Sequence, residues 1–177
     1  MAWYCEVAPG HPIHGPYHDR EYGFPIDDES LLFERLTLEI FQAGLSWLIV
    51  LKKRDGLRIG FENFNVDRVA DFIPADVERL ANDASIIRNR RKIEATIKNA
   101  QVVRNLRASH GGFACWIEAH HPLNRLEWCK LFRNTFSFMG KEVVGEFLMS
   151  IGYLPGAHAP SCPVYSRILE RHPPWSR

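Results

Sequence analysis

Hydrophobic residues recur at helical spacing along much of the chain. Residues 29–43 carry apolar side chains three or four positions apart, from Leu32 to Ala43, as on the buried face of a helix. Asp27 or Asp28 is placed to cap its first turn. No alternating run has the length of a strand, so the pattern predicts an all-α fold. The spacing predicts further short or amphipathic helices at residues 66–72, 77–82 (capped by Asp76), 89–107, 113–120 and 143–151.

Other stretches lack this periodicity. Residues 1–27 are interrupted by proline and glycine every few positions, and so is the first part of 152–177, which ends in a short helix. An irregular start of that length needs something to hold it in a compact protein. Residues 47–53 form an apolar segment, whereas 121–137 mix aromatic, apolar and basic positions without a clear assignment. We expect a single domain over 1–177.

Composition narrows the functional classes. The chain has 177 residues, of which 46% are hydrophobic and 24% charged, so it is typical of a globular protein. Its 22 basic and 21 acidic residues nearly cancel, which argues against binding by bulk charge. The basic cluster at 88–92 is a candidate phosphate contact, with a solvated helix face as the alternative. No membrane span or apolar leader is present, so we expect a cytoplasmic protein without membrane partners.

Cysteine and histidine residues at the two ends indicate a metal site. Cys5 and His18 lie in the irregular start, and His158 and Cys162 follow near the other end with H-x3-C spacing. Two thiolates and two imidazoles are a common tetrahedral set for structural zinc. A zinc ion on these four residues would join the two ends of the chain, and its binding energy would contribute to folding.

Spacing alone leaves other donors open. Four cysteines are too few for a disulfide scaffold of this length, which favours a reducing compartment. Cys115 and Cys129 lie among apolar and aromatic residues, so we expect both to be buried core thiols. Further histidine donors compete with the proposed ligands, at His11, His14, His120 and His121.

A carboxylate lies on the apolar face of the helix predicted at 29–43. Glu39 shares the face of the core-forming residues, where a carboxylate is costly unless it is paired or functional. Gln42 and Trp47 follow it, and Tyr17 and Tyr22 precede it. An acid, an amide and aromatic rings suit a pocket for a flat heteroaromatic ligand. Alternatively, Glu39 pairs with a basic residue at the edge of the core and the rings simply pack.

The chain resembles the bacterial DNA-3-methyladenine glycosylase I family of the helix-hairpin-helix glycosylase superfamily. The resemblance extends from about Cys5 to Tyr165, and its most specific block runs from Gln42 to Trp47. Its anchors are YHDREYG at 17–23, EIFQAGLSW at 39–47, LKKR at 51–54, IIRNRRKI at 86–93, Asn99-Ala100, and the final His158 and Cys162.

The resemblance implies a monomeric repair enzyme that hydrolyses the N-glycosidic bond of 3-methyladenine in double-stranded DNA by base flipping, the first step of base excision repair. It implies that Glu39 is the catalytic carboxylate, as an electrostatic stabiliser and hydrogen-bond acceptor. The base would be bound by Tyr17, Tyr22, Gln42 and Trp47. The family's zinc ligands fall on the four residues already reached by spacing.

The resemblance also implies a DNA-gripping hairpin around Gly140, Lys141 and Gly145, where glycines let the main chain approach phosphates. An ordinary turn between helices is the alternative. Glu142 and Glu146 put acid where basic or neutral residues are usual in the family.

Three positions of the presumed base pocket depart from the family pattern. Val7 replaces a usual tryptophan, His14 a usual tyrosine and Tyr22 a usual tryptophan. Loss of one stacking ring costs about 1–3 kcal/mol of base binding. Three functions therefore stay open: a 3-methyladenine glycosylase, a non-catalytic or differently specific DNA-binding relative, and a module that binds free purines.

Overall fold

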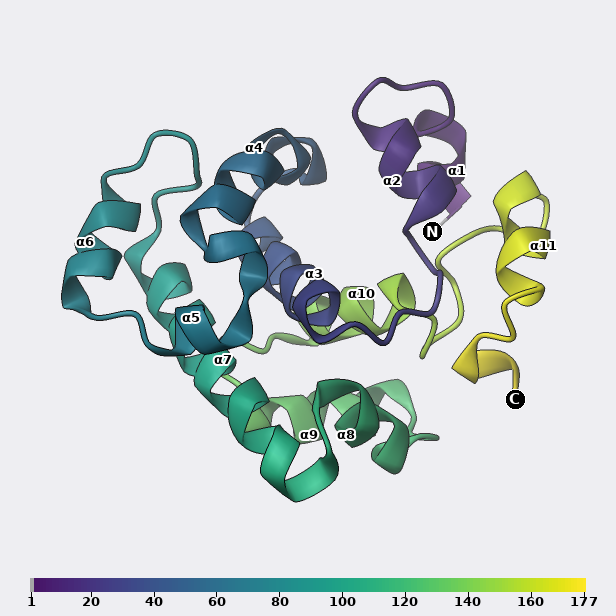
Figure 1. Ribbon diagram of the computed structural model, residues 1–177. Helices are drawn as coiled ribbons and strands as arrows, with labels where there is room; N and C mark the ends of the chain where they lie inside the picture. Colours follow the sequence, from purple (N-terminus) through teal and green to yellow (C-terminus); the bar gives the residue numbers. More distant parts are fainter. Residues whose placement is uncertain (1) are drawn as a thin grey trace.

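The computed structural model describes residues 2–177, and within that range all regular structure is helical, as predicted (Figure 1). The elements, in chain order, are α1 (Ala2–Val7), α2 (His14–Arg20), α3 (Glu29–Gln42), α4 (Trp47–Gly60), the 3-10 turn η1 (Glu62–Phe64), α5 (Val66–Ala70), α6 (Pro74–Ala81), α7 (Arg90–His110), α8 (Phe113–His120), α9 (Arg125–Thr135), α10 (Lys141–Ser150), α11 (Pro163–Leu169) and η2 (Pro174–Ser176).

Helix α3 lies at the centre of the fold. The Asp28 side chain accepts a hydrogen bond from the Leu31 amide at 2.9 Å and so caps the first turn, as expected. The helix packs against α4, α7, α8 and α10, and every residue from Leu32 to Phe41 is buried. Both polar and apolar residues of this helix are therefore buried. Its buried charged side chains need partners or a functional role.

The long helix α7 follows the predicted boundaries closely at its start. Asn89 caps it by accepting from the Lys92 amide, and Gly111 ends it in the left-handed conformation at φ +85°. Lys92, in the basic cluster at 88–92, is buried and donates to the carbonyl oxygens of Phe41 and Ala43. It thus stabilises the carboxyl end of α3 and is not available to a phosphate.

Several local predictions need correction. Residues 1–27 are not irregular throughout, because they contain α1 and α2, and 121–137 contain α9. Asp76 is not an N-cap: it lies in the first turn of α6, which starts at Pro74, and its carboxylate accepts from the amide of Ile73. Cys115 is exposed, contrary to expectation, whereas Cys129 is buried.

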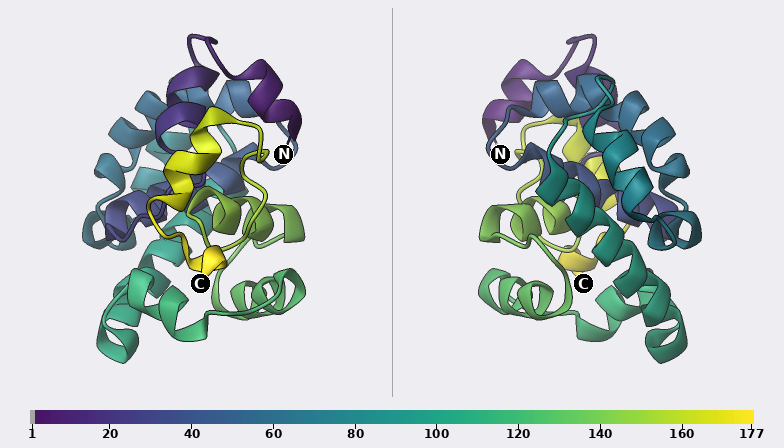
Figure 2. Two further views of the ribbon diagram at one scale, coloured as in Figure 1. Left: turned by 90° about the vertical axis from the view of Figure 1, so that its right-hand side faces the viewer. Right: turned by 90° about the vertical axis from the view of Figure 1, so that its left-hand side faces the viewer.

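The two ends of the chain lie beside each other. Helices α1 and α2 and helix α11 occupy the same side of the molecule (Figures 1 and 2). Arg167 of α11 donates a hydrogen bond to the carbonyl oxygen of Asp19 at 3.1 Å. Because these helices are short, contacts between the ends have to supplement the small apolar area that each one buries.

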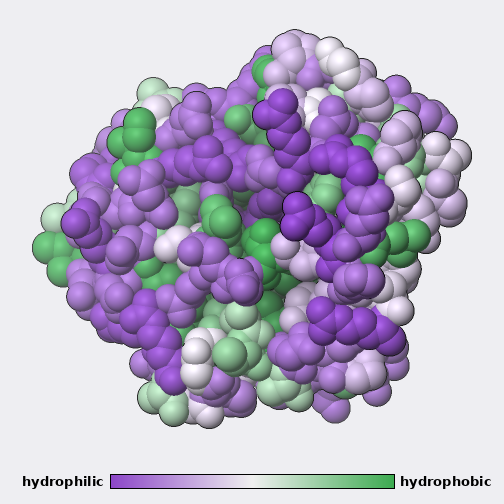
Figure 3. Space-filling model, turned by 45° about the vertical axis from the view of Figure 1, so that its right-hand side comes forward, coloured by the Kyte–Doolittle hydropathy of each residue, from purple (hydrophilic) through white to green (hydrophobic). Residues whose placement is uncertain are grey.

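The surface exposes both hydrophilic and hydrophobic residues. The face in Figure 3 is mostly hydrophilic around its edge, and hydrophobic residues gather towards its middle. None of the helices in the described part of the chain is both long and apolar enough to cross a membrane.

Candidate functional site

A cavity of about 410 Å³ lies between the N-terminal helices and the centre of the fold. This volume falls within the range of about 300–1,000 Å³ that is typical of small-molecule sites. Helices α1, α2, α3, α4 and α10, with their flanking residues, contribute its walls. The lining residues are Tyr4, Tyr17, Tyr22, Glu39, Gln42, Ser46, Trp47, Glu142 and Glu146.

Glu39 is buried in the wall of this cavity. Its exposed fraction is 4%, and its carboxylate makes no hydrogen bond or ion pair with the residues that the structure describes. Arg35, one turn earlier on α3, pairs instead with Glu21 at 2.9 Å. Burial, reinforced by the nearby charge of Glu146, raises the pKa of Glu39 well above its ordinary value. The alternative, a Glu39 paired with a basic residue, is therefore wrong.

Aromatic rings form much of the remaining wall. The Tyr17 ring lies 5.1 Å from that of Trp47 and 5.7 Å from that of Tyr22, measured between centroids. Tyr4 stands almost perpendicular to Tyr22 at 5.6 Å. The sequence correctly placed Tyr17, Tyr22, Trp47 and Gln42 around Glu39, but gave no signal for Tyr4 because its orientation depends on how α1 docks.

A network of ion pairs holds the Tyr17 ring on its side away from the cavity. The Arg35 guanidinium lies over the Tyr17 ring at 4.9 Å, and its nitrogen donates to the Tyr17 hydroxyl at 3.4 Å. Glu21 accepts from both Arg35 and Arg54, and Arg54 also donates to Glu34. Although burial acts against ionisation, the hydrogen bond from Arg54 lowers the pKa of Glu21. Each charged side chain of this network therefore has a partner of opposite charge.

Helix α10 adds two carboxylates to the cavity. The Tyr22 hydroxyl donates to Glu146 Oε2 at 3.1 Å, and burial raises the pKa of Glu146. Glu142 is exposed at the rim, where Arg125 lies 3.4 Å from its Oε2 atom. The sequence showed these residues only as unusual acids near a predicted hairpin, since helical spacing does not reveal which face of α10 meets the cavity.

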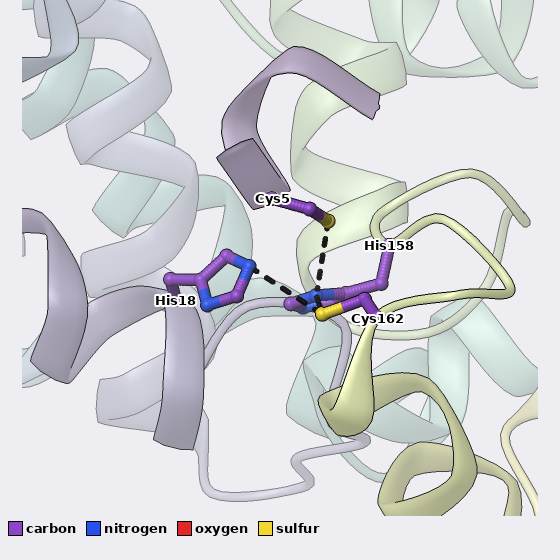
Figure 4. Close-up of side chains that lie close together, drawn as sticks. All are labelled: Cys5, His18, His158 and Cys162. Atoms are coloured by element: carbon purple, nitrogen blue, oxygen red, sulfur yellow. Dashed lines mark hydrogen bonds between the residues drawn. The ribbon is translucent and has the colours of Figure 1, made fainter. Parts of the chain in front are cut away.

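Cys5, His18, His158 and Cys162 form a compact cluster, as predicted. Their donor atoms all lie within 4.8 Å of one another, and the side chains converge from both ends of the chain (Figure 4). His158 Nδ1 is 3.6 Å from Cys5 Sγ and 3.5 Å from Cys162 Sγ, and His18 Nε2 is 3.8 Å from Cys162 Sγ. These four residues can hold a metal ion.

Both histidines of the cluster are oriented by their second ring nitrogen. His18 Nδ1 lies 2.6 Å from the Asp19 carboxylate, and His158 Nε2 donates to the Tyr22 carbonyl oxygen at 2.8 Å. Burial lowers the pKa of His158 to about 4, so the ring is neutral near pH 7 and its Nδ1 lone pair faces the thiols. Metal-binding histidines in proteins are typically held by such partners.

The cluster and the cavity share structural elements. Tyr4 precedes Cys5 on α1, and its ring packs edge-on against His18 at 5.5 Å. The Tyr22 main chain accepts from His158, while its side chain lines the cavity. Bringing the two ends of the chain together therefore also positions two aromatic walls.

Comparison with known proteins identifies the family of this chain. The chain matches the methyladenine glycosylase family over residues 7–128. It belongs to this family.

Individual members of the methyladenine glycosylase family support the match. DNA-3-methyladenine glycosylase 1 of Escherichia coli (strain K12) is 51% identical over 97 residues, which cover 55% of this chain but only 52% of that protein. DNA-3-methyladenine glycosylase of Haemophilus influenzae is 31% identical, covering 92% of this chain and 98% of the relative. A solved tyrosine-to-phenylalanine variant of 3-methyladenine DNA glycosylase I, in complex with 3-methyladenine, has a TM-score of 0.79 and 27% identity, covering 91% and 96% of the two chains.

The three positions that depart from the family pattern differ in whether they line the cavity. Val7 is half-exposed and does not line the cavity. Among the residues whose side chains the structure describes, Tyr4, about one helical turn earlier, gives the cavity an aromatic ring from α1. His14 Nδ1 lies 3.3 Å from the Tyr4 hydroxyl, and Tyr22 lines the cavity directly. The site of this family member is therefore ring-lined despite Val7.

The segment expected to grip DNA is only partly suited to that role. Gly140 caps α10, and a Cβ there would have open space, while Lys141 is exposed in the first turn. Gly145 is buried inside the helix, where a Cβ would collide with the Arg125 guanidinium. Gly145 therefore lies against the end of a flexible side chain inside α10, and its contact with DNA stays a prediction.

Proposed function

We propose that this protein hydrolyses the N-glycosidic bond of an alkylated adenine, 3-methyladenine, in double-stranded DNA as the first step of base excision repair. The observation that carries the proposal is the buried carboxylate of Glu39, unpaired in the wall of a ring-lined cavity. Relatives named as DNA-3-methyladenine glycosylases, one of them solved with 3-methyladenine, support the same substrate.

The chemistry suits the residues present. Alkylation at N3 places a positive charge on the adenine ring while the base is attached to the sugar, so the leaving group needs no added proton. The glycosidic bond breaks with its electron pair passing to the base, and a water molecule adds to the sugar carbon and loses a proton. The enzyme has to evert the base, recognise it and stabilise the developing charge.

Each wall of the cavity then has a role. Tyr17, Tyr22 and Trp47 offer ring faces and edges that attract a cationic, electron-poor base. Glu39 stabilises positive charge and accepts a hydrogen bond from the exocyclic amine. Gln42 supplies an amide at the same wall to read the edge of the base.

Contact with DNA is proposed at two places. Helices α9 and α10 flank the turn that ends at Gly140, in keeping with a helix-hairpin-helix, and Gly140 and Lys141 offer a helix amino terminus to a phosphate. Leu45 is an exposed apolar residue between the cavity residues Gln42 and Ser46. It is placed to fill the space that an everted base leaves in the duplex.

We propose that the Cys/His cluster binds structural zinc. Tetrahedral zinc with bonds of about 2.3 Å to sulfur and about 2.0–2.1 Å to nitrogen sets neighbouring sulfur and nitrogen ligands about 3.6 Å apart. The three sulfur–nitrogen distances given above, 3.5, 3.6 and 3.8 Å, fit this value. Zinc would hold the chain ends together and take no part in bond cleavage.

The experiment that tests the proposed function measures free base released from methylated duplex DNA. Wild-type protein should release 3-methyladenine, and Glu39→Gln should do so about 10–100-fold more slowly because charge stabilisation is lost. An unmethylated duplex is the control. Salt-sensitive DNA binding without release by the wild type would instead favour a non-catalytic relative. Binding of free purines without DNA affinity would favour the small-molecule module.

A further inference from the structure

The cavity proposed to receive a base from DNA carries three carboxylates. Glu39, Glu142 and Glu146 all line it, and none of the described residues in its wall is lysine, arginine or histidine. Arg125 pairs with Glu142 at the rim. Negative charge in the cavity opposes the phosphates that accompany every nucleotide, so it needs a compensating attraction to the ligand.

Two of these carboxylates point to a positively charged ligand. Glu39 is more than nine-tenths buried and has no partner in the described structure. Glu146 is half-buried, and the only side-chain hydrogen bond it receives among the described residues comes from Tyr22. The charge of Glu146 adds to burial in raising the pKa of Glu39, whereas Arg35 lowers it, so each ionised carboxylate disfavours ionisation of the other. A cation between them would relieve that repulsion, whereas a neutral ring would not.

We propose that Glu146 is a specificity-determining residue that acts with Glu39 to select a positively charged alkylated base over a neutral base of the same shape. The inference deepens the proposed function and rests on it for the identity of the base. Glu146 also accepts the hydroxyl hydrogen bond of Tyr22, so its charge and its support of an aromatic wall must be separated by experiment.

Calorimetric titration with two free ligands measures the selection directly. The 3,9-dimethyladeninium ion carries a permanent positive charge, with a methyl group in place of the sugar, and 9-methyladenine is its neutral counterpart. Wild-type protein should bind the cation more tightly. Glu146→Gln keeps the side-chain shape and should weaken cation binding about tenfold, while neutral binding changes less than about threefold.

Three further variants separate charge from structure. Tyr22→Phe removes the hydrogen bond but keeps the carboxylate, so it should preserve the preference for the cation. Glu146→Asp should retain more of that preference than Glu146→Gln. Glu142→Gln, at the exposed and paired rim position, should change it less than about twofold. Glu146→Ser removes the charge with a smaller side chain and replaces Glu146→Gln if that variant does not fold.

Equal weakening of both ligands in Glu146→Gln, or an equal loss of preference in Tyr22→Phe, would overturn the inference in favour of simple wall support. Base release from methylated DNA, assayed on the same preparations, keeps the two proposals distinct. A wild type that prefers the cation but releases no base would refute the glycosylase proposal alone. A wild type that releases base but shows no cation preference would refute the role of Glu146 alone.

Discussion

Two carboxylates on helix α3 are buried to nearly the same extent but have opposite surroundings. Glu34 is 3% exposed and accepts hydrogen bonds from Arg54 at 2.7 Å and Arg58 at 2.8 Å. Glu39 is 4% exposed and has no such partner in the described structure. They lie five residues apart on one helix, so the difference comes from what packs against each of them and not from the helix itself.

The contrast separates two uses of buried charge. A paired carboxylate such as Glu34 links α3 to α4, and removal of its charge leaves arginines without their partner. An unpaired carboxylate raises the free energy of the folded state, and it is retained where a ligand supplies the missing partner. We therefore propose that Glu34 serves stability and Glu39 serves function.

The largest expected effect is the loss of stability on replacing Glu34, the carboxylate paired with two arginines. Glu34→Gln should lower the free energy of unfolding by about 3 kcal/mol, because Arg54 and Arg58 lose the charge that they share. Urea denaturation at pH 7 measures the change. Glu39→Gln, the matched control on the same helix, should not lower stability. A loss of stability in Glu39→Gln equal to that in Glu34→Gln would show that both carboxylates serve the fold.

Metal removal should show whether the Cys/His cluster supports the cavity. Stripping the Cys/His cluster with a chelator should reduce base release about a hundredfold, because Tyr4 and Tyr22 lose their fixed positions in the cavity wall. Metal content and base release should be measured on one sample, with restoration by added zinc as the control. Full activity in protein shown to contain no metal would contradict the proposed coupling.

A pH series should sharpen the contrast with a smaller effect. Folding raises the pKa of Glu39 above its ordinary value of 4.5, so it favours the protonated carboxyl. This contribution to stability is present below pH 4.5 and is lost as the pH rises through the folded-state pKa. The difference amounts to about 1.4 kcal/mol for each unit by which the pKa is raised.

Measurement of unfolding free energy from pH 4 to 8 compares wild type with Glu39→Gln, which has no group to titrate at this position. The wild type should lose stability relative to the variant across the interval above pH 4.5. A constant difference between the two proteins over the whole series would show that the pKa of Glu39 is not raised by folding.

The sequence was most informative where residue chemistry is restrictive. Cys5, His18, His158 and Cys162 could be named because few side chain types bind metal, and the family resemblance selected these four among the competing histidines. Glu39 could be named because helical periodicity placed an acid on an apolar face. In the structure the four Cys and His donors lie together, and Glu39 lines the cavity.

The remaining features depend on tertiary packing. The inward orientation of Tyr4 and Glu146 depends on where helices α1 and α10 pack in the fold, which local spacing does not encode. Helix α9 was overlooked although a signal existed: Asn124 and Glu127 form a capping box at its start. A glycine that packs inside a helix and a glycine that contacts a phosphate look alike in sequence, so the role of Gly145 stays a prediction.

The most direct test of the distinction between the two carboxylates is a double measurement on Glu39→Gln, combining unfolding free energy with 3-methyladenine release from methylated duplex DNA at pH 7. We expect stability equal to or above that of the wild type together with slower base release. A variant that is destabilised by several kcal/mol, yet releases the base at the wild-type rate, would show that Glu39 serves the fold and not the ligand.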